Sequence, residues 1–316
     1  MRPELKKLLE KQQYRIVGEH SASKVCEYVK KSLLNKDVCY KQKFYGIKSH
    51  QCVQMTPAVN YCTNECLFCW RAMDREFNDG MKIKKADSPQ EIIDQCIKNQ
   101  LKMLIGFRGN KKIDWKKYEE AQKPKHFAIS LTGEPTIYPK LKEMINCLKK
   151  MKITSFVVSN GMFPEKLKDL RPTQLYVSVF APNGKLYKKI SRTQIKNSWQ
   201  KLMKTMDALK DLRKKGVRTC LRITAIKNMN MIEPENYAKI IKKASPLFVE
   251  VKAYMNIGFS RLRMPDRSMP EHTEVKKFAN EIGKLCGYKI VDEKRESRVV
   301  LMMREKDLKK RFLDLD

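Results

Sequence analysis

The most reactive side chains of this chain gather in one short stretch, Tyr61 to Trp70, which reads YCTNECLFCW. Its three cysteines, Cys62, Cys66 and Cys69, stand at C-x3-C-x2-C spacing. A tetrahedral zinc site would need a fourth ligand, yet none of the four histidines of the chain flanks this loop. Thiolates are soft ligands that suit iron-sulfur clusters, and three of them on a four-iron cube leave one iron open to another ligand. The spacing therefore predicts a cluster with a vacant corner.

The residues between these cysteines argue against the plain alternative of three buried structural thiols. Thr63, Asn64 and Glu65 interrupt any strand or helix periodicity. The loop resembles the cluster loop of radical S-adenosylmethionine (SAM) enzymes. That resemblance implies that the amino and carboxylate groups of SAM chelate the open iron. It also implies that Phe68, just before the last cysteine, lies beside the adenine.

Three more cysteines, Cys26, Cys39 and Cys52, stand upstream of the loop at two equal intervals of thirteen residues. One interpretation is a second three-cysteine cluster, again with an open iron. The other is that three independent thiols pack in the interior, and the sequence leaves both open. The remaining cysteines lie among apolar neighbours and are assigned to packing: Cys96, Cys147, Cys220 and Cys286.

Charge is the most unusual global property of the chain. Its 316 residues contain 67 Lys and Arg against 35 Asp and Glu, a net charge of +32. Ion-pair networks would need nearly as many acids as bases, so the excess indicates a polyanionic partner, most simply nucleic acid. We expect its affinity to fall steeply with salt. A membrane surface is the rival partner, but no apolar run approaches the roughly 18 residues of a spanning helix.

Strands and helices alternate along most of the chain, which predicts a parallel sheet of the barrel type in one domain, or two small lobes. Residues 1 to about 50 read as basic and helical, and Ser88, Pro89 and Glu91 predict a capped helix start. Strands are expected at 54–60, 126–131, 154–158, 175–180, 218–226, 248–254 and 297–303. Helices are expected at 88–107, 138–150, 194–215, 234–244 and 271–286. We divide the chain into a helical, cysteine-bearing extension (1–52), a partial barrel (53–303) and a basic tail (304–316).

Unusual polar residues follow several of the expected strands. In βα barrels chemistry collects at the carboxyl ends of the strands, which is where the Cys62 loop, Gly133-Glu134, Ser159-Asn160 and the segment 254–256 fall. Gly133 would let the backbone approach a ligand, and Glu134 could accept from the ammonium group of SAM. Ser159 and Asn160 could bind its ribose or carboxylate, although turn chemistry explains them equally well.

Longer motifs carry a more specific resemblance, which runs from about residue 14 to about residue 303. They are CYKQKFYG (39–46), the loop 62–70, SLTGEPT (130–136), FVVSNG (156–161) and TQLYVS (173–178), together with the three upstream cysteines. With them the chain resembles the archaeal tRNA 4-demethylwyosine synthases, which are radical SAM enzymes. The resemblance implies an α/β fold with an incomplete (β/α)6 barrel. It implies a SAM-binding 4Fe-4S cluster on Cys62, Cys66 and Cys69, and a second 4Fe-4S cluster on Cys26, Cys39 and Cys52.

The resemblance also implies the reaction. Pyruvate condenses with N1-methylguanosine next to the anticodon of tRNA(Phe), after a SAM-derived radical takes a hydrogen from the methyl group. Pyruvate is held by the open iron of the second cluster or as a Schiff base on a lysine, for which the resemblance points to Lys41, with Lys43 next. From the residues alone, a solvated basic loop that faces tRNA is the alternative for this segment. Phe180 stands where some relatives carry an aspartate, which leaves the contacts of its strand with SAM or substrate open.

The resemblance and composition together indicate a cytoplasmic enzyme, expected as a monomer, with an external flavodoxin- or ferredoxin-type electron donor. Two rival functions remain: a radical SAM methylase or methylthiolase acting on RNA, and a non-catalytic, metal-stabilised RNA-binding protein. Metal analysis separates the outcomes, because two clusters bind about eight irons and one binds about four. Zinc without iron would support the binding protein.

Overall fold

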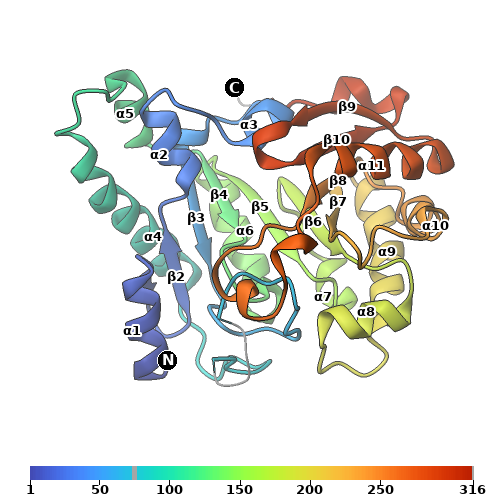
Figure 1. Ribbon diagram of the computed structural model, residues 1–316. Helices are drawn as coiled ribbons and strands as arrows, with labels where there is room; N and C mark the ends of the chain where they lie inside the picture. Colours follow the sequence, from blue (N-terminus) through green and yellow to red (C-terminus); the bar gives the residue numbers. More distant parts are fainter. Residues whose placement is uncertain (73–76, 315–316) are drawn as a thin grey trace.

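A single ten-stranded sheet forms the centre of the computed structural model, which describes residues 1–72 and 77–314. Its strand order is β1-β2-β3-β4-β5-β6-β7-β8-β10-β9 (Figure 1). The strands are β1 (Arg15–Val17), β2 (Ser21–Lys24), β3 (Cys52–Thr56), β4 (His126–Ile129), β5 (Thr154–Ser159), β6 (Gln174–Val179), β7 (Arg218–Ala225), β8 (Phe248–Ala253), β9 (Lys289–Lys294) and β10 (Val299–Met303).

Six strands, β3 to β8, run parallel, each paired with the next along the chain. Parallel strands are buried on both faces and need a crossover between them, which helices on the outside provide. The outer strands β1 and β9 are not paired with each other in the described part of the chain, so the barrel stays open. The predicted α/β fold with an incomplete six-stranded barrel is therefore confirmed.

Helices cover the outer side of the curled sheet (Figure 1). Neighbouring helices contact one another along it, α4 with α6, α9 with α10, and α10 with α11. The helices are α1 (Pro3–Lys11), α2 (Glu27–Leu33), α3 (Tyr40–Tyr45), α4 (Pro89–Leu104), α5 (Trp115–Ala121), α6 (Leu141–Lys150), α7 (Pro164–Leu167), α8 (Gly184–Ser191), α9 (Ser198–Lys214), α10 (Pro234–Ala244) and α11 (His272–Cys286). No described helix is both long enough and apolar enough to cross a lipid bilayer.

The first 50 residues are less helical than the sequence indicates. Besides α1, α2 and α3 they contain the hairpin β1-β2, and β2 pairs antiparallel with β3. At the other end, β9 was also not predicted, and it pairs antiparallel with β10. The capping box expected at Ser88 is wrong: Ser88 is the N-cap residue, with Pro89 and Glu91 in the first turn, but its side chain makes no capping hydrogen bond. A capping box does form at Glu271 and Glu274, at the start of α11.

Helix α3 closes the interior of the barrel at the amino ends of its strands. Phe44 and Tyr45 are fully buried and pack with aromatic side chains of the strands, including Phe156 and Phe248. Burying an aromatic side chain contributes roughly 1.5–3 kcal/mol. This packing fixes α3, which carries Lys41, against the inner face of the sheet.

The basic C-terminal segment packs back onto the barrel. Asp307, in the turn η7 (Glu305–Lys310), accepts two hydrogen bonds of 2.8 Å from Arg213. Arg218 donates to the carbonyl oxygen of Lys310. Arg213 and Arg218 come from the basic stretch RKKGVR. Both side chains hold the C-terminal segment against the barrel.

Candidate active site

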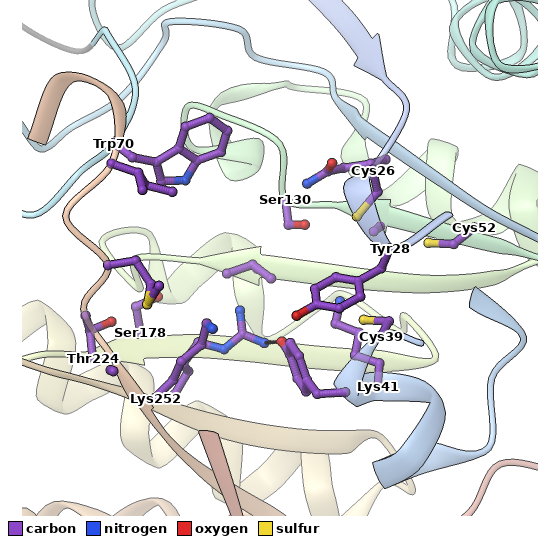
Figure 2. Close-up of a pocket in the computed structure, with 18 of the residues that line it drawn as sticks. Cys26, Tyr28, Cys39, Lys41, Cys52, Trp70, Ser130, Ser178, Thr224 and Lys252 are labelled. Carbon is purple, nitrogen blue, oxygen red and sulfur yellow. Dashed lines mark hydrogen bonds between the residues drawn. The ribbon is translucent and has the colours of Figure 1, made fainter. Parts of the chain in front are cut away.

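A cavity of about 490 Å³ opens into the barrel interior (Figure 2). It is lined by inward-facing residues of β3 to β8, by the starts of α2 and α3, and by the segment after β8. Six of the predicted site residues line it: Cys26, Cys39, Lys41, Cys52, Phe68 and Cys69. The others, apart from Lys43, lie around the neighbouring Cys62 end of the loop.

The three cysteines of the loop are close enough to influence one another. Burial, followed by the Glu134 carboxylate and Cys69 as smaller causes, raises the pKa of the Cys62 thiol to about 12. Burial likewise raises the pKa of Cys66, with Cys69 and Cys62 as the next causes. A bound metal reverses this effect, because a coordinated thiol loses its proton. Three free, partly buried thiols in one loop are the donor set that an iron-sulfur cluster needs.

Backbone hydrogen bonds hold this loop at the carboxyl ends of the strands. Its amide groups at Glu65 and Leu67 donate to carbonyl oxygens at the end of α8, each at 3.0 Å. From the segment after β8, Arg263 donates to the carbonyl oxygen of Leu67. Gly258 lies so close to the carbonyl oxygen of Trp70 that a Cβ would meet it at 2.3 Å. The loop is therefore clamped from two sides, which makes its thiols a preorganised ligand set.

Gly133 is required where β4 turns toward the loop. Its φ is +66°, and a Cβ would lie 1.8 Å from the carbonyl oxygen of Ala58. The next residue, Glu134, donates its amide to the carbonyl oxygen of Tyr61 at 2.7 Å. The glycine thus permits close approach to the backbone that leads into the cluster loop. The predicted approach of this backbone to a ligand stays a prediction.

Replacing Gly133 by alanine is expected to displace the loop. The variant combines left-handed backbone strain with a clash that costs roughly 1–3 kcal/mol beyond the strain. Gly216→Ala is the matched control, because Gly216 also has a positive φ but no atom lies within 4 Å of the point that its Cβ would occupy. Urea unfolding should show a larger decrease in the free energy of unfolding for Gly133→Ala than for Gly216→Ala. Gly133→Ala should also bind SAM more weakly. Equal losses for the two variants would contradict this role.

The Glu134 carboxylate is buried and bound by its own chain. Its oxygens accept from the Thr136 hydroxyl at 2.6 Å, the Ser159 hydroxyl at 2.8 Å and the Asn160 amide at 2.7 Å. Burial raises the pKa of Glu134, and these hydrogen bonds oppose the rise. The predicted contact with the ammonium of SAM stays a prediction. In this structure Glu134 ties the ends of β4 and β5 together beside Cys62.

Asn160 reaches the cluster loop directly. Its side-chain Nδ2 donates to the Thr63 hydroxyl at 2.8 Å and approaches the Cys62 sulfur at 3.8 Å. Ser159 donates to Glu134 and accepts from the Gly161 amide at 3.0 Å. Their predicted contacts with the ribose or carboxylate of SAM stay predictions. The contacts seen are those of groups that orient a metal ligand.

The upstream cysteines Cys26, Cys39 and Cys52 gather on one side of the cavity (Figure 2). Cys26 and Cys39 are the N-cap residues of α2 and α3, and Cys52 begins β3. Burial raises the pKa of Cys39 to about 11 and that of Cys52 to about 12. No three His, Cys, Asp or Glu side chains in the described ranges converge on a single ion. Cluster thiolates need not converge, since each binds a different iron.

Lys41 lies inside the cavity, whereas Lys43 does not. Lys41 is 8% exposed, and its Nζ stands 4.9 Å from the ring centroid of Phe156 and 5.2 Å from that of Tyr176. Aromatic rings do cover this amine, but they come from β5 and β6 rather than from its own loop. Lys43 is half exposed and pairs with Asp292 at 2.9 Å on the outside. The structure therefore separates the two candidate lysines.

Comparisons with known proteins identify the family. The radical SAM superfamily matches residues 56–241, and the wyosine base formation family matches residues 243–304. The S-adenosyl-L-methionine-dependent tRNA 4-demethylwyosine synthase of Pyrococcus abyssi (strain GE5 / Orsay) is 46% identical over 311 residues, which cover 96% of this chain and 90% of the relative. The chain belongs to the tRNA 4-demethylwyosine synthase family. It is thus a radical SAM enzyme of wyosine-base formation, and the resemblance read from its motifs is confirmed.

Two solved structures share the fold of this chain. A structure of TYW1 with a lysine-pyruvate adduct bound is 35% identical, with a TM-score of 0.87, and the match covers 100% of this chain and 99% of that one. A crystal structure of archaeal TYW1 is 34% identical, with a TM-score of 0.80 and 97% of both chains covered. Family membership implies SAM and an iron-sulfur cluster as cofactors.

Phe180, where the family resemblance left the contacts open, supports the side wall of the synthase site. It is buried, its ring centroid lies 5.0 Å from that of Phe68, and it stacks on Tyr187 at the same distance. An aromatic pair of this kind adds about 0.5–1.5 kcal/mol to area burial. In this chain Phe180 therefore fixes the orientation of Phe68, the residue predicted to lie beside the adenine.

Sequence reasoning missed two cations of the synthase cavity. Arg222 on β7 and Lys252 on β8 both line it. Arg222 contacts a single oxygen of buried Glu250, Oε2, through Nε at 2.9 Å and Nη2 at 2.8 Å, and it donates to the Tyr40 hydroxyl at 2.7 Å. Their strands, RTCLRITA and FVEVKA, carry other polar or charged residues as well. A charged residue in the middle of a predicted barrel strand was the available signal.

Proposed function

We propose that this chain condenses pyruvate with N1-methylguanosine next to the anticodon of tRNA(Phe) to form 4-demethylwyosine. One observation carries the proposal: a single cavity contains Cys69 and Phe68 of the cluster loop together with the amine of Lys41. SAM chemistry and amine chemistry can therefore act on one substrate. The related structure with a lysine-pyruvate adduct supports the same combination.

Two sets of thiols fit the proposed cofactors. Cys62, Cys66 and Cys69 would hold the SAM-binding 4Fe-4S cluster. The second set would hold another 4Fe-4S cluster: Cys26, Cys39 and Cys52. When bound, the first cluster supplies the electron that cleaves SAM, and a flavodoxin- or ferredoxin-type donor would supply that electron to the cluster. The chain itself positions the thiols of the first set by the loop clamps and the Asn160 contact.

Lys41 is proposed to bind pyruvate as a Schiff base. Its amine adds to the ketone carbon, the new C–N bond forms, and the carbonyl oxygen leaves as water. The rings of Phe156 and Tyr176 face the amine and keep it in one orientation. Holding the keto acid on the chain converts a bimolecular encounter into a positioned reaction. Lys43 has no part in this proposal, because it faces away from the cavity.

The tRNA is proposed to dock over the mouth of the cavity. Ile257 and Trp70 line this mouth, and Leu262, a few residues further on, is 78% exposed beside Arg261. A target base must leave its stack to reach an interior pocket, which costs a few kcal/mol. Apolar and cationic groups at the rim suit that task. We propose that the enzyme acts as a monomer in the cytoplasm, where its tRNA substrate resides.

Anaerobic incubation with SAM, pyruvate, a reductant and methylated tRNA tests the function directly. Nucleoside mass spectrometry should detect 4-demethylwyosine, and omission of pyruvate should abolish it. A methylated or methylthiolated base formed without pyruvate would instead support the RNA methylase or methylthiolase. Tight tRNA binding with no product and no SAM cleavage would support the non-catalytic binding protein.

Iron analysis tests the second cluster separately. The reconstituted protein should bind about eight irons, and Cys26→Ala should lower this to about four, because one of two clusters loses a ligand. Cys147→Ala is the matched control, since Cys147 is a partly buried free thiol on α6 outside the cavity. It should retain the full iron content. About four irons in the unaltered protein would overturn the two-cluster proposal.

A further inference from the structure

The ammonium group of Lys252 lies in the cavity without a carboxylate partner. Its Nζ donates to the carbonyl oxygen of Ser297 at 2.9 Å and stands 5.6 Å from the ring centroid of Tyr40. No ion pair joins it to any Asp or Glu of residues 1–72 and 77–314. Burial, with Arg222 next, lowers the pKa of Lys252 to about 8. Lys252 is partly exposed and lines the cavity, so its ammonium group is available to an anion that enters there.

Arg222 stands beside Lys252 with part of its guanidinium unused. Its Nε and Nη2 bind Glu250 and the Tyr40 hydroxyl. No hydrogen bond of Nη1 occurs within the described ranges, although Arg222 lines the cavity. The Glu250 carboxylate neutralises Arg222 and holds it in place. Glu250 does not form an ion pair with Lys252 as well. Arg222 and Lys252 therefore each keep an N–H donor for a ligand oxygen.

Lys41 and these two cations share aromatic neighbours. Tyr176 lies under the Lys41 amine, and the Arg222 guanidinium lies 4.4 Å from the same ring centroid. Tyr40 in turn neighbours both Arg222 and Lys252. Figure 2 shows Lys252 across the cavity from the three cysteines and Lys41. A small molecule bound to Lys41 would therefore lie in the same cavity as Lys252 and Arg222.

We propose that Lys252 and Arg222 form a carboxylate-binding subsite for the α-keto acid that reacts with Lys41. The inference rests on the proposed function and deepens it. The carboxylate of the keto acid pairs with the ammonium group of Lys252 and accepts a hydrogen bond from Arg222. These contacts turn the ketone carbon toward the Lys41 amine. The bond changes remain those at Lys41, where the C–N bond forms and water leaves. The subsite explains why the enzyme would select an α-keto acid over an uncharged ketone.

Borohydride trapping on the anaerobically reconstituted, full-length protein tests the subsite. Intact-protein mass spectrometry gives the concentration of pyruvate that traps half of the chains, and peptide mapping locates the adduct. In Lys252→Met this concentration should rise roughly tenfold or more, as expected for loss of a charge-assisted contact. Methyl pyruvate has the same ketone without the negative charge, and its half-trapping concentration should change little.

Two further variants separate a ligand contact from a general structural effect. Lys252→Arg keeps the charge and should recover most of the preference for pyruvate. Lys289→Met is the control, since Lys289 is exposed on β9 in a surface pair with Glu305, and it should behave as the unaltered protein. The proposal would be overturned if Lys252→Met had the same half-trapping concentration of pyruvate as the unaltered protein, or if the adduct mapped to Lys252 itself.

Direct binding keeps the subsite testable if no adduct forms. Equilibrium dialysis with radiolabelled pyruvate measures occupancy whether or not a Schiff base follows. Weaker binding in Lys252→Met without any Lys41 adduct would support the subsite and overturn the Schiff base. Equal binding in the two proteins would show that the carboxylate is held elsewhere, and the subsite would then be wrong.

Discussion

Replacing Lys41 by methionine is expected to abolish the pyruvate adduct and to reduce 4-demethylwyosine formation by at least about a hundredfold. The change removes the protein atom that forms a covalent bond to the keto acid in the proposed reaction, and lost positioning of this kind costs orders of magnitude in rate. Methionine keeps the length and the contacts with Phe156 and Tyr176. Borohydride trapping followed by peptide mapping measures the first effect, and nucleoside mass spectrometry measures the second.

Lys43→Met discriminates between the two lysines of the same motif. Lys43 pairs with Asp292 and donates to the carbonyl oxygen of Glu293 outside the cavity. Its replacement should leave the adduct and the product unchanged. SAM cleavage without tRNA should continue in Lys41→Met, because the cluster thiols are not altered. An adduct that persists in Lys41→Met and disappears in Lys43→Met would refute the assignment.

The parallel half of the fold could be predicted from sequence because most of its strands are short segments rich in apolar and β-branched residues. The strand expected at 175–180 is observed as Gln174–Val179, and the one expected at 248–254 as Phe248–Ala253. Each is followed by a helix or by a polar turn, so the order of elements implies parallel pairing. The placement of polar residues at the carboxyl ends then follows from barrel geometry.

The antiparallel additions could not be predicted in the same way. The strands β1 and β2 have only three and four residues, too few to show a period of two, and SASK is not an apolar sequence. They form strands because β3 supplies an edge to pair with, which is a tertiary effect. The same holds for β9, which pairs with β10 and was hidden by its charged sequence, KIVDEK.

The candidate site was predictable where its residues are neighbours in sequence. The three cysteines of the loop define their own ligand set by spacing alone. Arg222 and Lys252 carry no local motif, and they meet Lys41 only because the sheet curls around the cavity. Likewise, the sequence around Lys41 and Lys43 does not indicate which of the two lysines faces the cavity. That choice depends on how Phe44 and Tyr45 seat α3 in the barrel.

Glu250→Ala is expected to destabilise the protein strongly, by roughly 3–5 kcal/mol, which is the usual cost of leaving a buried charge unpaired. Glu250 is fully buried and accepts from the Tyr45 hydroxyl at 2.6 Å as well as from Arg222. It thus joins α3 to β7 and β8. Its removal leaves the Arg222 guanidinium without its carboxylate partner and the Tyr45 hydroxyl without its acceptor. Urea unfolding followed by circular dichroism measures the loss.

The surface pair of Glu165 and Lys168 provides the control for this prediction. Both side chains are more than half exposed, and such pairs contribute little because water and salt screen them. Glu165→Ala should therefore leave the urea midpoint unchanged. Because Glu250 anchors the helix that carries Lys41, folded Glu250→Ala protein should also trap pyruvate more weakly at subdenaturing temperature. Full stability in Glu250→Ala would mean that the Arg222 charge finds another partner and that α3 is held by apolar packing alone.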